Sequence, residues 1–184
     1  MRIIAGEWRG RVLKAPPGDN TRPTADRTRE ALFSMLTSRL GSFEGLAVAD
    51  VFAGSGALGL EAMSRGAASC IFIDQDRDAI RAIRANIDLL GANAEVLPIA
   101  VSAIGPARKA CDLLLFDPPY GSGGAGALLE KMTRLGWATE SAWAAIETRN
   151  DESVSAEDWA LDVERRHGIA KLSVLCRTAP AQPG

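Results

Sequence analysis

Short apolar segments alternate with amphipathic ones along most of the chain from Gly45 onward. The apolar segments predict buried strands, and the amphipathic segments between them predict helices that are apolar on one side only. This order favours a doubly wound α/β fold with a mostly parallel sheet, in which ligands sit beyond the carboxyl ends of the strands. The expected strands are 47–52, 69–74, 95–99, 113–117 and 142–147, and the expected helices are 58–65, 77–90 and 127–135.

Two regions lie outside this alternation. Residues 159–166 and 171–176 predict a closing hairpin, whose antiparallel strands make the sheet seven-stranded. Near the start, residues 3–15 predict a short hairpin or irregular ribbon, and Thr24 can cap a helix that ends at Gly41. The chain is therefore expected to comprise a basic N-terminal extension (1–23), a main domain (24–178) and a disordered tail (179–184) of prolines and small residues.

The composition is that of a globular protein, since 47% of the 184 residues are apolar and 24% are charged. Disorder of the whole chain is excluded, because disordered chains lack the apolar residues to form a core. The apolar runs are shorter than the roughly 20 residues of a membrane span, and the start lacks the apolar stretch of a secretory signal, so a cytoplasmic protein is expected. Three dispersed cysteines predict reduced thiols, and the lone His167 predicts no metal site.

The formal net charge of −2 conceals a basic N-terminal segment. Residues 1–29 hold seven basic and three acidic side chains, so a polyanion is expected to meet this segment first. A basic surface that is merely solvated is the alternative interpretation. The cations expected to contact a nucleic acid are Arg2, Arg9, Arg11, Lys14, Arg22 and Arg29.

The most informative segment is a glycine-rich turn between an expected strand and an expected helix, Asp50-Val-Phe-Ala-Gly54-Ser-Gly56-Ala-Leu-Gly59. Gly54 and Gly56 permit a tight turn and a close approach of a ligand to the backbone, while Gly59 permits close packing of the helix on the sheet. The next expected strand ends in Asp74, whose carboxylate can hold ribose hydroxyls. The turn therefore predicts a nucleotide-type ligand, with a turn selected for packing alone as the alternative.

Two ligands of this type compete for the turn. A dinucleotide would place its pyrophosphate at the helix N-terminus, whereas S-adenosylmethionine carries no phosphate. A carboxylate at Asp50 would repel a pyrophosphate but suits the ammonium and sulfonium charges of the methyl donor. The acidic residue favours S-adenosylmethionine, and a NAD-dependent oxidoreductase stays as the second candidate.

A second motif follows the apolar run 113–116, where the chain continues as Asp117-Pro118-Pro119-Tyr120. The two prolines fix φ and favour extended backbone, so the Asp117 carboxylate and the Pro118 carbonyl can form a rigid pair of acceptors for an exocyclic amine. Tyr120 can stack on a flat ring, which contributes about 1–3 kcal/mol per base in proteins that bind single strands. A proline-stiffened turn with an aromatic lid and no ligand is the alternative.

Taken together, the glycine turn, Asp74 and Asp-Pro-Pro-Tyr resemble class I S-adenosylmethionine-dependent amino methyltransferases. The chain is further similar to the RsmD family, which methylates the N2 amine of a guanine in 16S ribosomal RNA. The segments that carry this likeness are 2–6, 9–11, 21–24, 26–33 and 145–147, followed by the pattern Trp159…Gly168…Leu172. The resemblance runs from Met1 to about Cys176, and His167 departs from it because an aromatic residue is more usual there.

The resemblance implies roles for individual residues. Gly54, Ser55 and Gly56 would wrap the methionine moiety with Asp50 beside it, and Asp74 would hold the ribose. The implied donor-binding set is Asp50, Phe52, Gly54, Ser55, Gly56, Asp74, Gln75, Ala100 and Val101, the last two beside adenine, and the implied catalytic set is Asp117, Pro118, Pro119 and Tyr120. The implied partner is 16S ribosomal RNA within a small-subunit particle, with neither DNA nor a membrane as partner.

The expected reaction methylates a guanine that has left its stack. Asp117 and the Pro118 carbonyl would meet the N2 hydrogens while the ring lies against Tyr120. A carboxylate is too weak a base to deprotonate a neutral amine, so Asp117 is expected to orient the amine and stabilise the developing positive charge before it accepts any proton.

Three other functions are weighed beside this one and the oxidoreductase. DNA adenine-N6 methyltransferases usually carry an added recognition domain, for which 184 residues leave little room. Protein-glutamine methyltransferases carry Asn where Asp117 stands. A non-catalytic RNA-binding module would need neither the donor turn nor the Asp-Pro-Pro-Tyr motif.

Overall fold

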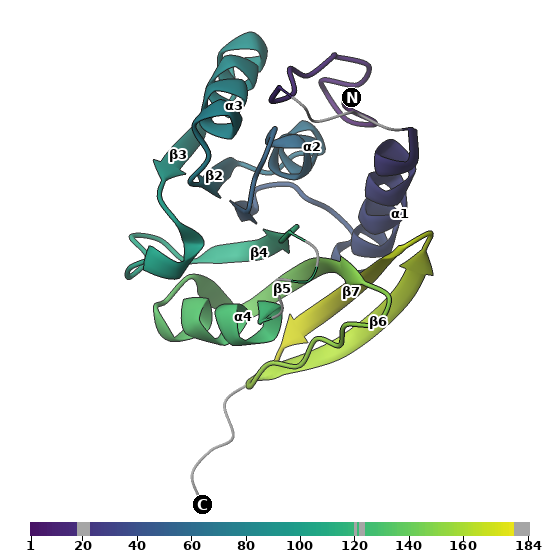
Figure 1. Ribbon diagram of the computed structural model, residues 1–184, viewed down its shortest axis with the longest axis vertical. Coiled ribbons are helices and arrows are strands. Elements are labelled where there is room, and N and C mark those ends of the chain that lie inside the picture. The colour runs from purple at the N-terminus through teal and green to yellow at the C-terminus, as the bar shows by residue number, and fades with distance from the viewer. Residues whose placement is uncertain (18–22, 120, 122–123, 179–184) are drawn as a thin grey trace, which may run out of the picture.

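The computed structural model describes residues 1–17, 23–119, 121 and 124–178 of the chain. Its strands are β1 (Ala47–Val51), β2 (Ser69–Asp74), β3 (Ala94–Pro98), β4 (Cys111–Phe116), β5 (Ala138–Arg149), β6 (Trp159–His167) and β7 (Ala170–Arg177). They form one seven-stranded sheet in the order β3-β2-β1-β4-β5-β7-β6 (Figure 1). Strands β1 to β5 are parallel, and β7 is antiparallel to both β5 and β6. The predicted α/β fold and its closing hairpin are therefore confirmed.

Helices cover both faces of this sheet (Figure 1). The helices are α1 (Pro23–Leu40), α2 (Ala57–Ser64), α3 (Arg77–Leu90), α4 (Ala125–Arg134) and the short 3-10 helix η1 (Val101–Ala103). The first three pack into one hydrophobic cluster, while α4 and η1 pack into the other. In β4, Leu113 and Leu115 belong to the first cluster and Leu114 and Phe116 to the second. Because both faces of such a strand are buried, its sequence is a continuous apolar run.

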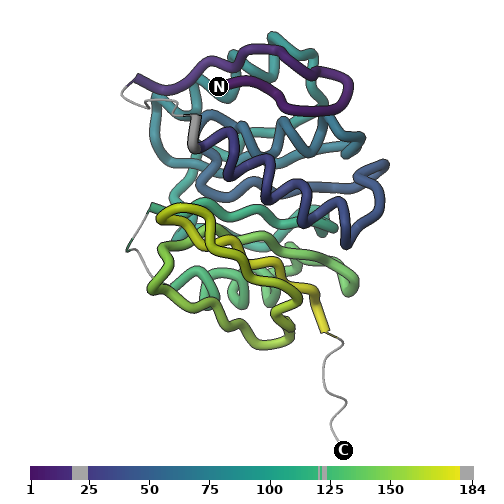
Figure 2. Tube along the Cα trace, turned by 90° about the vertical axis from the view of Figure 1, so that its right-hand side faces the viewer, coloured from purple at the N-terminus to yellow at the C-terminus, as the bar shows by residue number. Residues whose placement is uncertain are grey.

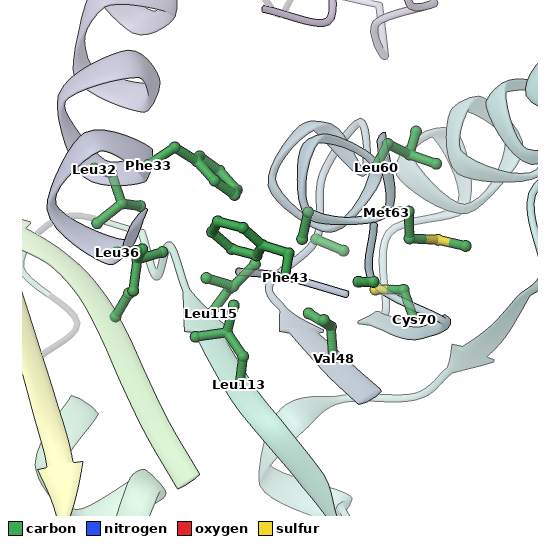
Figure 3. Packing of buried hydrophobic residues seen from close by; sticks show 14 of the residues in the cluster. Leu32, Phe33, Leu36, Phe43, Val48, Leu60, Met63, Cys70, Leu113 and Leu115 are labelled. Atoms are coloured by element: carbon green, nitrogen blue, oxygen red, sulfur yellow. The ribbon is translucent and has the colours of Figure 1, made fainter. Parts of the chain in front are cut away.

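Aromatic side chains join α1 to the centre of the first cluster. Phe33 of α1 and Phe43 lie with their ring centroids 5.6 Å apart. Figure 3 shows them beside Leu36, Leu113 and Leu115, which places α1 over the middle of the sheet.

Several boundaries differ from the sequence prediction by one or more residues, and the starts of α1 and β5 differ for a physical reason. Helix α1 begins at Pro23, so the position of Thr24 is inside the first turn and not at the N-cap, which agrees with the preference of proline for the first helical position. Strand β5 begins at Ala138, before the predicted residue 142. Its first part pairs with Cys111 before a register shift in the pairing with β4, and such an irregularity leaves no periodic pattern in the sequence.

Residues 1–15 form an irregular ribbon, as predicted, and pack on α2 and α3. A single bridge joins Arg2 to Val12 across the ribbon. Fully buried Glu61 of α2 accepts the backbone N–H groups of Ile4 at 2.8 Å and Ala5 at 3.0 Å. Figure 2 shows this segment in purple along the top of the molecule. The N-terminal segment is thus attached to the main fold through hydrogen bonds to a buried side chain.

The three cysteines are unpaired, as expected; Cys70 and Cys111 are buried and Cys176 is half-buried. Burial raises the pKa of the Cys111 thiol to about 12, so it stays protonated at neutral pH. Over the described ranges, the helices are too short or too polar to cross a lipid bilayer.

Candidate active site

The glycine-rich turn and the loop after β4 meet in one cavity at the carboxyl edge of the sheet. The sheet order explains this meeting, because β1 lies between β2 and β4 and the loops that follow these strands are neighbours. The cavity has a volume of about 560 Å³, which is usual for a small-molecule site. It is lined by Phe52, Gly54, Asp74, Gln75, Asp76, Val101, Asp117, Pro118, Pro119 and Glu147.

The glycine turn consists largely of residues in the left-handed backbone region. Gly54 and Gly56 have φ values of 57° and 79°, and Phe52 adopts a φ of 63°, which is uncommon for a bulky side chain. A Cβ atom added to Gly54 would meet no other atom within 4 Å, so space for a ligand is open beside it. A Cβ atom on Gly59 would lie 2.5 Å from the Cys70 Sγ, which confirms that this glycine permits close packing of α2 on β2.

Asp74 fastens the turn to the end of β2. Its Oδ2 accepts the backbone N–H of Gly54 at 2.8 Å, and its Oδ1 accepts the backbone N–H of Asp76 at 2.9 Å. Each carboxylate oxygen has a second lone pair, which can accept a hydrogen bond from a ribose hydroxyl. Asp76 in turn caps α3 by accepting the N–H groups of Asp78 and Ala79, both at 2.9 Å.

Asp50 lies beneath the turn and is only 1% exposed. Its Oδ2 accepts the backbone N–H of Gly59 at 2.8 Å, whereas its buried Oδ1 has no hydrogen-bond partner among the described residues. Burial raises the pKa of Asp50 well above its ordinary value; the Gly59 hydrogen bond opposes this, and the charges of Asp117 and Asp74 add to it. A ligand that brings positive charge would oppose this rise in pKa and favour the ionised form of Asp50.

The electrostatic character of the cavity distinguishes between the two candidate ligands, S-adenosylmethionine and a dinucleotide. Its described lining includes the carboxylates of Asp74, Asp76, Asp117 and Glu147 and contains no lysine, arginine or histidine. These carboxylates repel a pyrophosphate and attract a sulfonium or an ammonium group. The residues present therefore fit S-adenosylmethionine better than a dinucleotide.

The expected donor-binding residues fall into two groups. Those in the cavity lining are Phe52, Gly54, Asp74, Gln75 and Val101, whereas Asp50, Ser55, Gly56 and Ala100 are outside it. Ser55 is buried and donates from its Oγ to the Met1 Sδ at 3.2 Å. A Cβ atom on Gly56 would lie 3.2 Å from the Phe72 ring, so this glycine faces the core between α2 and the sheet.

The residues expected to contact the methyl-accepting base lie at the mouth of the same cavity. Asp117 and Pro119 are exposed and Pro118 is buried. The backbone N–H of Asp117 donates to the carbonyl of Val51 at 3.3 Å, which extends the pairing of β4 with β1 into the start of the loop. Tyr120 lies outside the described residues.

Two cavity residues were absent from the site predicted from sequence. Asp76 is two residues past Asp74, where the N-cap of the following helix is expected. Glu147 lies near the carboxyl end of β5, and the matching ends of parallel strands meet at one edge of the sheet. Both residues lie at or just after the carboxyl end of an expected strand. The rule that these ends meet at one edge of the sheet could therefore have identified both residues from the sequence.

The basic residues expected to contact RNA differ in accessibility. Arg2, Arg9, Arg11 and Lys14 are exposed, while Arg22 lies outside the described residues. Arg29, by contrast, is only 5% exposed. Its guanidinium donates to the carbonyl of Arg2 and to Asp26 and lies 3.9 Å from the Glu61 carboxylate. Arg29 therefore does not meet the expectation of an RNA contact, because its guanidinium is buried and already bound to groups of the protein.

The sheet order, the glycine turn after β1 and the Asp117 loop after β4 define a class I methyltransferase. A family model described as "Conserved hypothetical protein 95" matches residues 1–176, and the chain belongs to this family, the RsmD family that its motifs resemble.

Similar proteins support this assignment. "Ribosomal RNA small subunit methyltransferase D" of Escherichia coli K12 is 35% identical over 190 residues, which cover 99% of this chain and 92% of the relative. The solved structure of yhhF from Escherichia coli has a TM-score of 0.82 and 36% identity, and covers 97% of this chain and 98% of that one. The fold alone is shared with a magnesium protoporphyrin IX methyltransferase from Synechocystis, solved with bound S-adenosylmethionine, at a TM-score of 0.64 and 14% identity over 84% of this chain and 80% of that one.

Proposed function

We propose that this methyltransferase transfers a methyl group from S-adenosylmethionine to the exocyclic N2 amine of a guanine in 16S ribosomal RNA. The observation that carries the proposal is the single acidic cavity shared by the glycine turn and the Asp117 corner. An rRNA substrate is supported by the name of the 35% identical Escherichia coli relative. The N2 amine of guanine is the acceptor that the RsmD resemblance implies.

The residues of the turn supply the donor side of the site. S-adenosylmethionine, when bound, supplies a methyl group on a positively charged sulfur. Asp74 would hold the ribose hydroxyls while its hydrogen bond keeps Gly54 in place. Buried Asp50, whose Oδ1 has no hydrogen-bond partner among the described residues, lies beneath the turn, and a cationic ligand would offset the burial that raises its pKa and so favour its ionised form. Val101 and Phe52 offer apolar surface in the cavity for the adenine ring.

The Asp117 corner supplies the acceptor side. The lone pair of the guanine N2 amine is delocalised into the ring, so the site must align the amine and stabilise the charge that develops on it. The exposed Asp117 carboxylate and the Pro118 carbonyl would accept hydrogen bonds from the two N2 hydrogens. Once the N–CH₃ bond has formed, the nitrogen is cationic and acidic, so Asp117 can accept the surplus proton at that stage.

The exposed cations of the N-terminal segment would hold the RNA backbone. Contacts to phosphate position a nucleic acid without reading its sequence. Arg9, Arg11 and Lys14 are exposed on a ribbon whose backbone is fixed to α2 and α3. We propose that the substrate is a small-subunit particle and that the target base reaches the cavity by leaving its stack.

Methyl transfer to defined particles tests this function. Small ribosomal subunits from a strain lacking this modification, and naked 16S ribosomal RNA, are incubated with the protein and S-adenosylmethionine carrying a tritiated methyl group. We expect label on the N2 amine of one guanine, and preference for the particle over naked RNA. Label on adenine N6 or on protein, or no label on either substrate, would contradict the proposal.

A binding titration distinguishes the two candidate ligands, S-adenosylmethionine and NAD. Isothermal titration with S-adenosylmethionine and with NAD should show binding of the first alone, because the cavity lining is acidic. Tighter binding of NAD would support the oxidoreductase instead.

A further inference from the structure

The strand that contributes Glu147 to the cavity leads directly to a second hollow. Alternate residues of a strand share one side and are about 7 Å apart, so Glu147 and Arg149 are neighbours on the same side of β5. The second hollow has a volume of about 520 Å³ and is lined by Arg149, Asn150, Asp151 and Ile169. We call these four residues the rim pocket. The rim pocket therefore follows the active-site cavity along β5, at the carboxyl edge of the sheet.

The turn between β6 and β7 forms one wall of the rim pocket. Ala170 pairs with both Arg149 and His167, so the turn residues Gly168 and Ile169 lie beside the end of β5. The Asn150 Nδ2 donates to the Gly168 carbonyl at 2.9 Å, which fastens the turn to the strand. Gly168 has a φ of 65°, as the first central position of a two-residue hairpin turn requires.

This geometry leaves Ile169 at the tip of the hairpin with 72% of its surface exposed. Figure 2 shows the start of β7 on the same side of the molecule as the end of the purple N-terminal segment. Ile169 thus offers apolar surface within the rim pocket, beside Arg149.

Arg149 supplies the charge that the active-site cavity lacks. Within the described ranges, it is the one cation among the residues that line the two hollows. Its side chain is 54% exposed and pairs with Asp151 at 3.2 Å, and Asp151 is 69% exposed. Exposed pairs of this kind are weak, so the guanidinium is available to a competing anion. RNA phosphates that pass an acidic cavity need such a cation nearby.

We propose that the rim pocket binds the nucleotide adjacent to the target guanine, with Arg149 at its phosphate and Ile169 against its ribose or base. The proposal rests on the proposed function, because it requires an RNA substrate. When a base leaves its stack, the face of its neighbour is uncovered, and an apolar side chain can cover that face.

Two variants and a matched control test the rim pocket. Arg149→Gln removes the charge and Ile169→Ser removes the apolar surface. Arg134→Gln is the control, because Arg134 is also exposed, at 66%, and pairs with a carboxylate, Glu130, at 4.0 Å. Arg134 lies in the last turn of α4, which leads back to the start of β5 at the opposite edge of the sheet.

The readouts are KM for small subunits, binding of a 16S ribosomal RNA fragment as a function of salt, and affinity for S-adenosylmethionine. For Arg149→Gln we expect KM to rise about tenfold and the salt slope of RNA binding to fall by about one, with donor affinity unchanged. For Ile169→Ser we expect a KM rise of about threefold with an unchanged salt slope. Arg134→Gln should match the wild type.

The outcomes separate this proposal from the proposed function. If Arg149→Gln and Arg134→Gln behave alike while the wild type methylates RNA, the rim pocket is overturned and the proposed function stands. If the wild type binds RNA without methylating it, the proposed function fails and the salt slopes alone decide the rim pocket. Absence of RNA binding by the wild type overturns both.

Discussion

Each carboxylate of the cavity has surroundings that suit a different task. Asp74 is held by two backbone N–H groups and lies beside the open space at Gly54. Asp50 is buried, and one of its oxygens has no hydrogen-bond partner among the described residues, whereas Asp117 is exposed at the mouth where a base can enter. Donor binding and acceptor activation can therefore be separated by substitution.

Replacing Asp117 tests the acceptor role. Asp117→Asn removes the charge that stabilises the methylated amine but leaves the glycine turn intact. We expect the rate of methyl transfer in single-turnover assays to fall by about 10²–10³. Affinity for S-adenosylmethionine, measured by calorimetry, should change by less than about threefold.

Glu140→Gln serves as the control, because Glu140 is an exposed carboxylate of the same sheet near the start of β5. It should alter neither quantity. Equal losses of rate and donor affinity in Asp117→Asn would contradict the acceptor role.

The raised pKa of Asp50 predicts a pH-dependent stability difference. As pH rises above about 3.9, the ordinary pKa of aspartate, the unfolded chain releases this proton while the folded chain retains it. The free energy of unfolding therefore falls as pH rises towards the folded-state pKa, the reverse of the behaviour of a salt-bridged aspartate. Asp50→Asn does not ionise and retains an acceptor for the Gly59 N–H.

The variant should therefore gain stability relative to the wild type as pH rises from about 4 to neutrality, as urea unfolding at several pH values would measure. Its affinity for S-adenosylmethionine should fall. A stability difference that does not change with pH would show that Asp50 does not titrate as its burial predicts.

Among individual residues, those in sequence motifs were easier to predict than the interaction partners of buried charged side chains. Gly54, Asp74 and Asp117 were assigned to the site from sequence, and all three line the cavity. The burial of Arg29 was missed, because its partners come from distant segments and arginine is usually exposed. Such tertiary pairing leaves no local pattern in the sequence.

Among the elements, the contact of α2 with β2 determines where the donor turn lies. Helix α2 starts directly after the turn and approaches β2 closely at Gly59. A side chain there would push the helix and the turn away from the sheet.

Gly59→Ala is therefore expected to lower the free energy of unfolding by about 1–3 kcal/mol, because its Cβ would overlap the Cys70 sulfur and the Phe72 ring. Urea unfolding measures this change. Gly105→Ala is the control, since a Cβ there meets nothing within 4 Å, and it should change stability by less than about 1 kcal/mol. Equal stabilities of the two variants would contradict the close packing at Gly59.

Element types were predicted well because periodicity is a local property. The apolar strands and the amphipathic α3 lie close to their predicted ranges. The first residues of β5 and the order of strands in the sheet depend on pairing between distant segments, which periodicity does not encode.

Across the whole molecule, charge is divided between an acidic cavity and a basic N-terminal ribbon. The buried side chains of Glu61, Ser64 and Asn86 bind the backbone of this ribbon and fix the positions from which its cations project. The positive segment was evident from composition, whereas its attachment to α2 and α3 was not, because three isolated polar residues inside helices form no recognisable motif.

Arg9→Gln combined with Arg11→Gln tests the ribbon as a phosphate-binding surface. We expect the slope of log affinity for 16S ribosomal RNA against log salt to decrease by about 1.5, because two phosphate contacts are lost. Donor affinity should be unchanged. Arg108→Gln with Arg134→Gln, which removes two exposed arginines elsewhere, is the matched control. An unchanged slope in the ribbon variant would identify the ribbon as a solvated surface.

The proposed reaction requires one cavity to receive both the methyl donor and the base that accepts the methyl group. The position of the target guanine in a cryo-electron microscopy structure of this protein on an unmethylated small subunit, with S-adenosylhomocysteine bound, tests it most directly. We expect the flipped base beside Asp117 and Pro118, with its N2 amine facing the sulfur above the glycine turn. A target base seated outside this cavity, or a ligand bound away from Gly54 and Asp74, would contradict it.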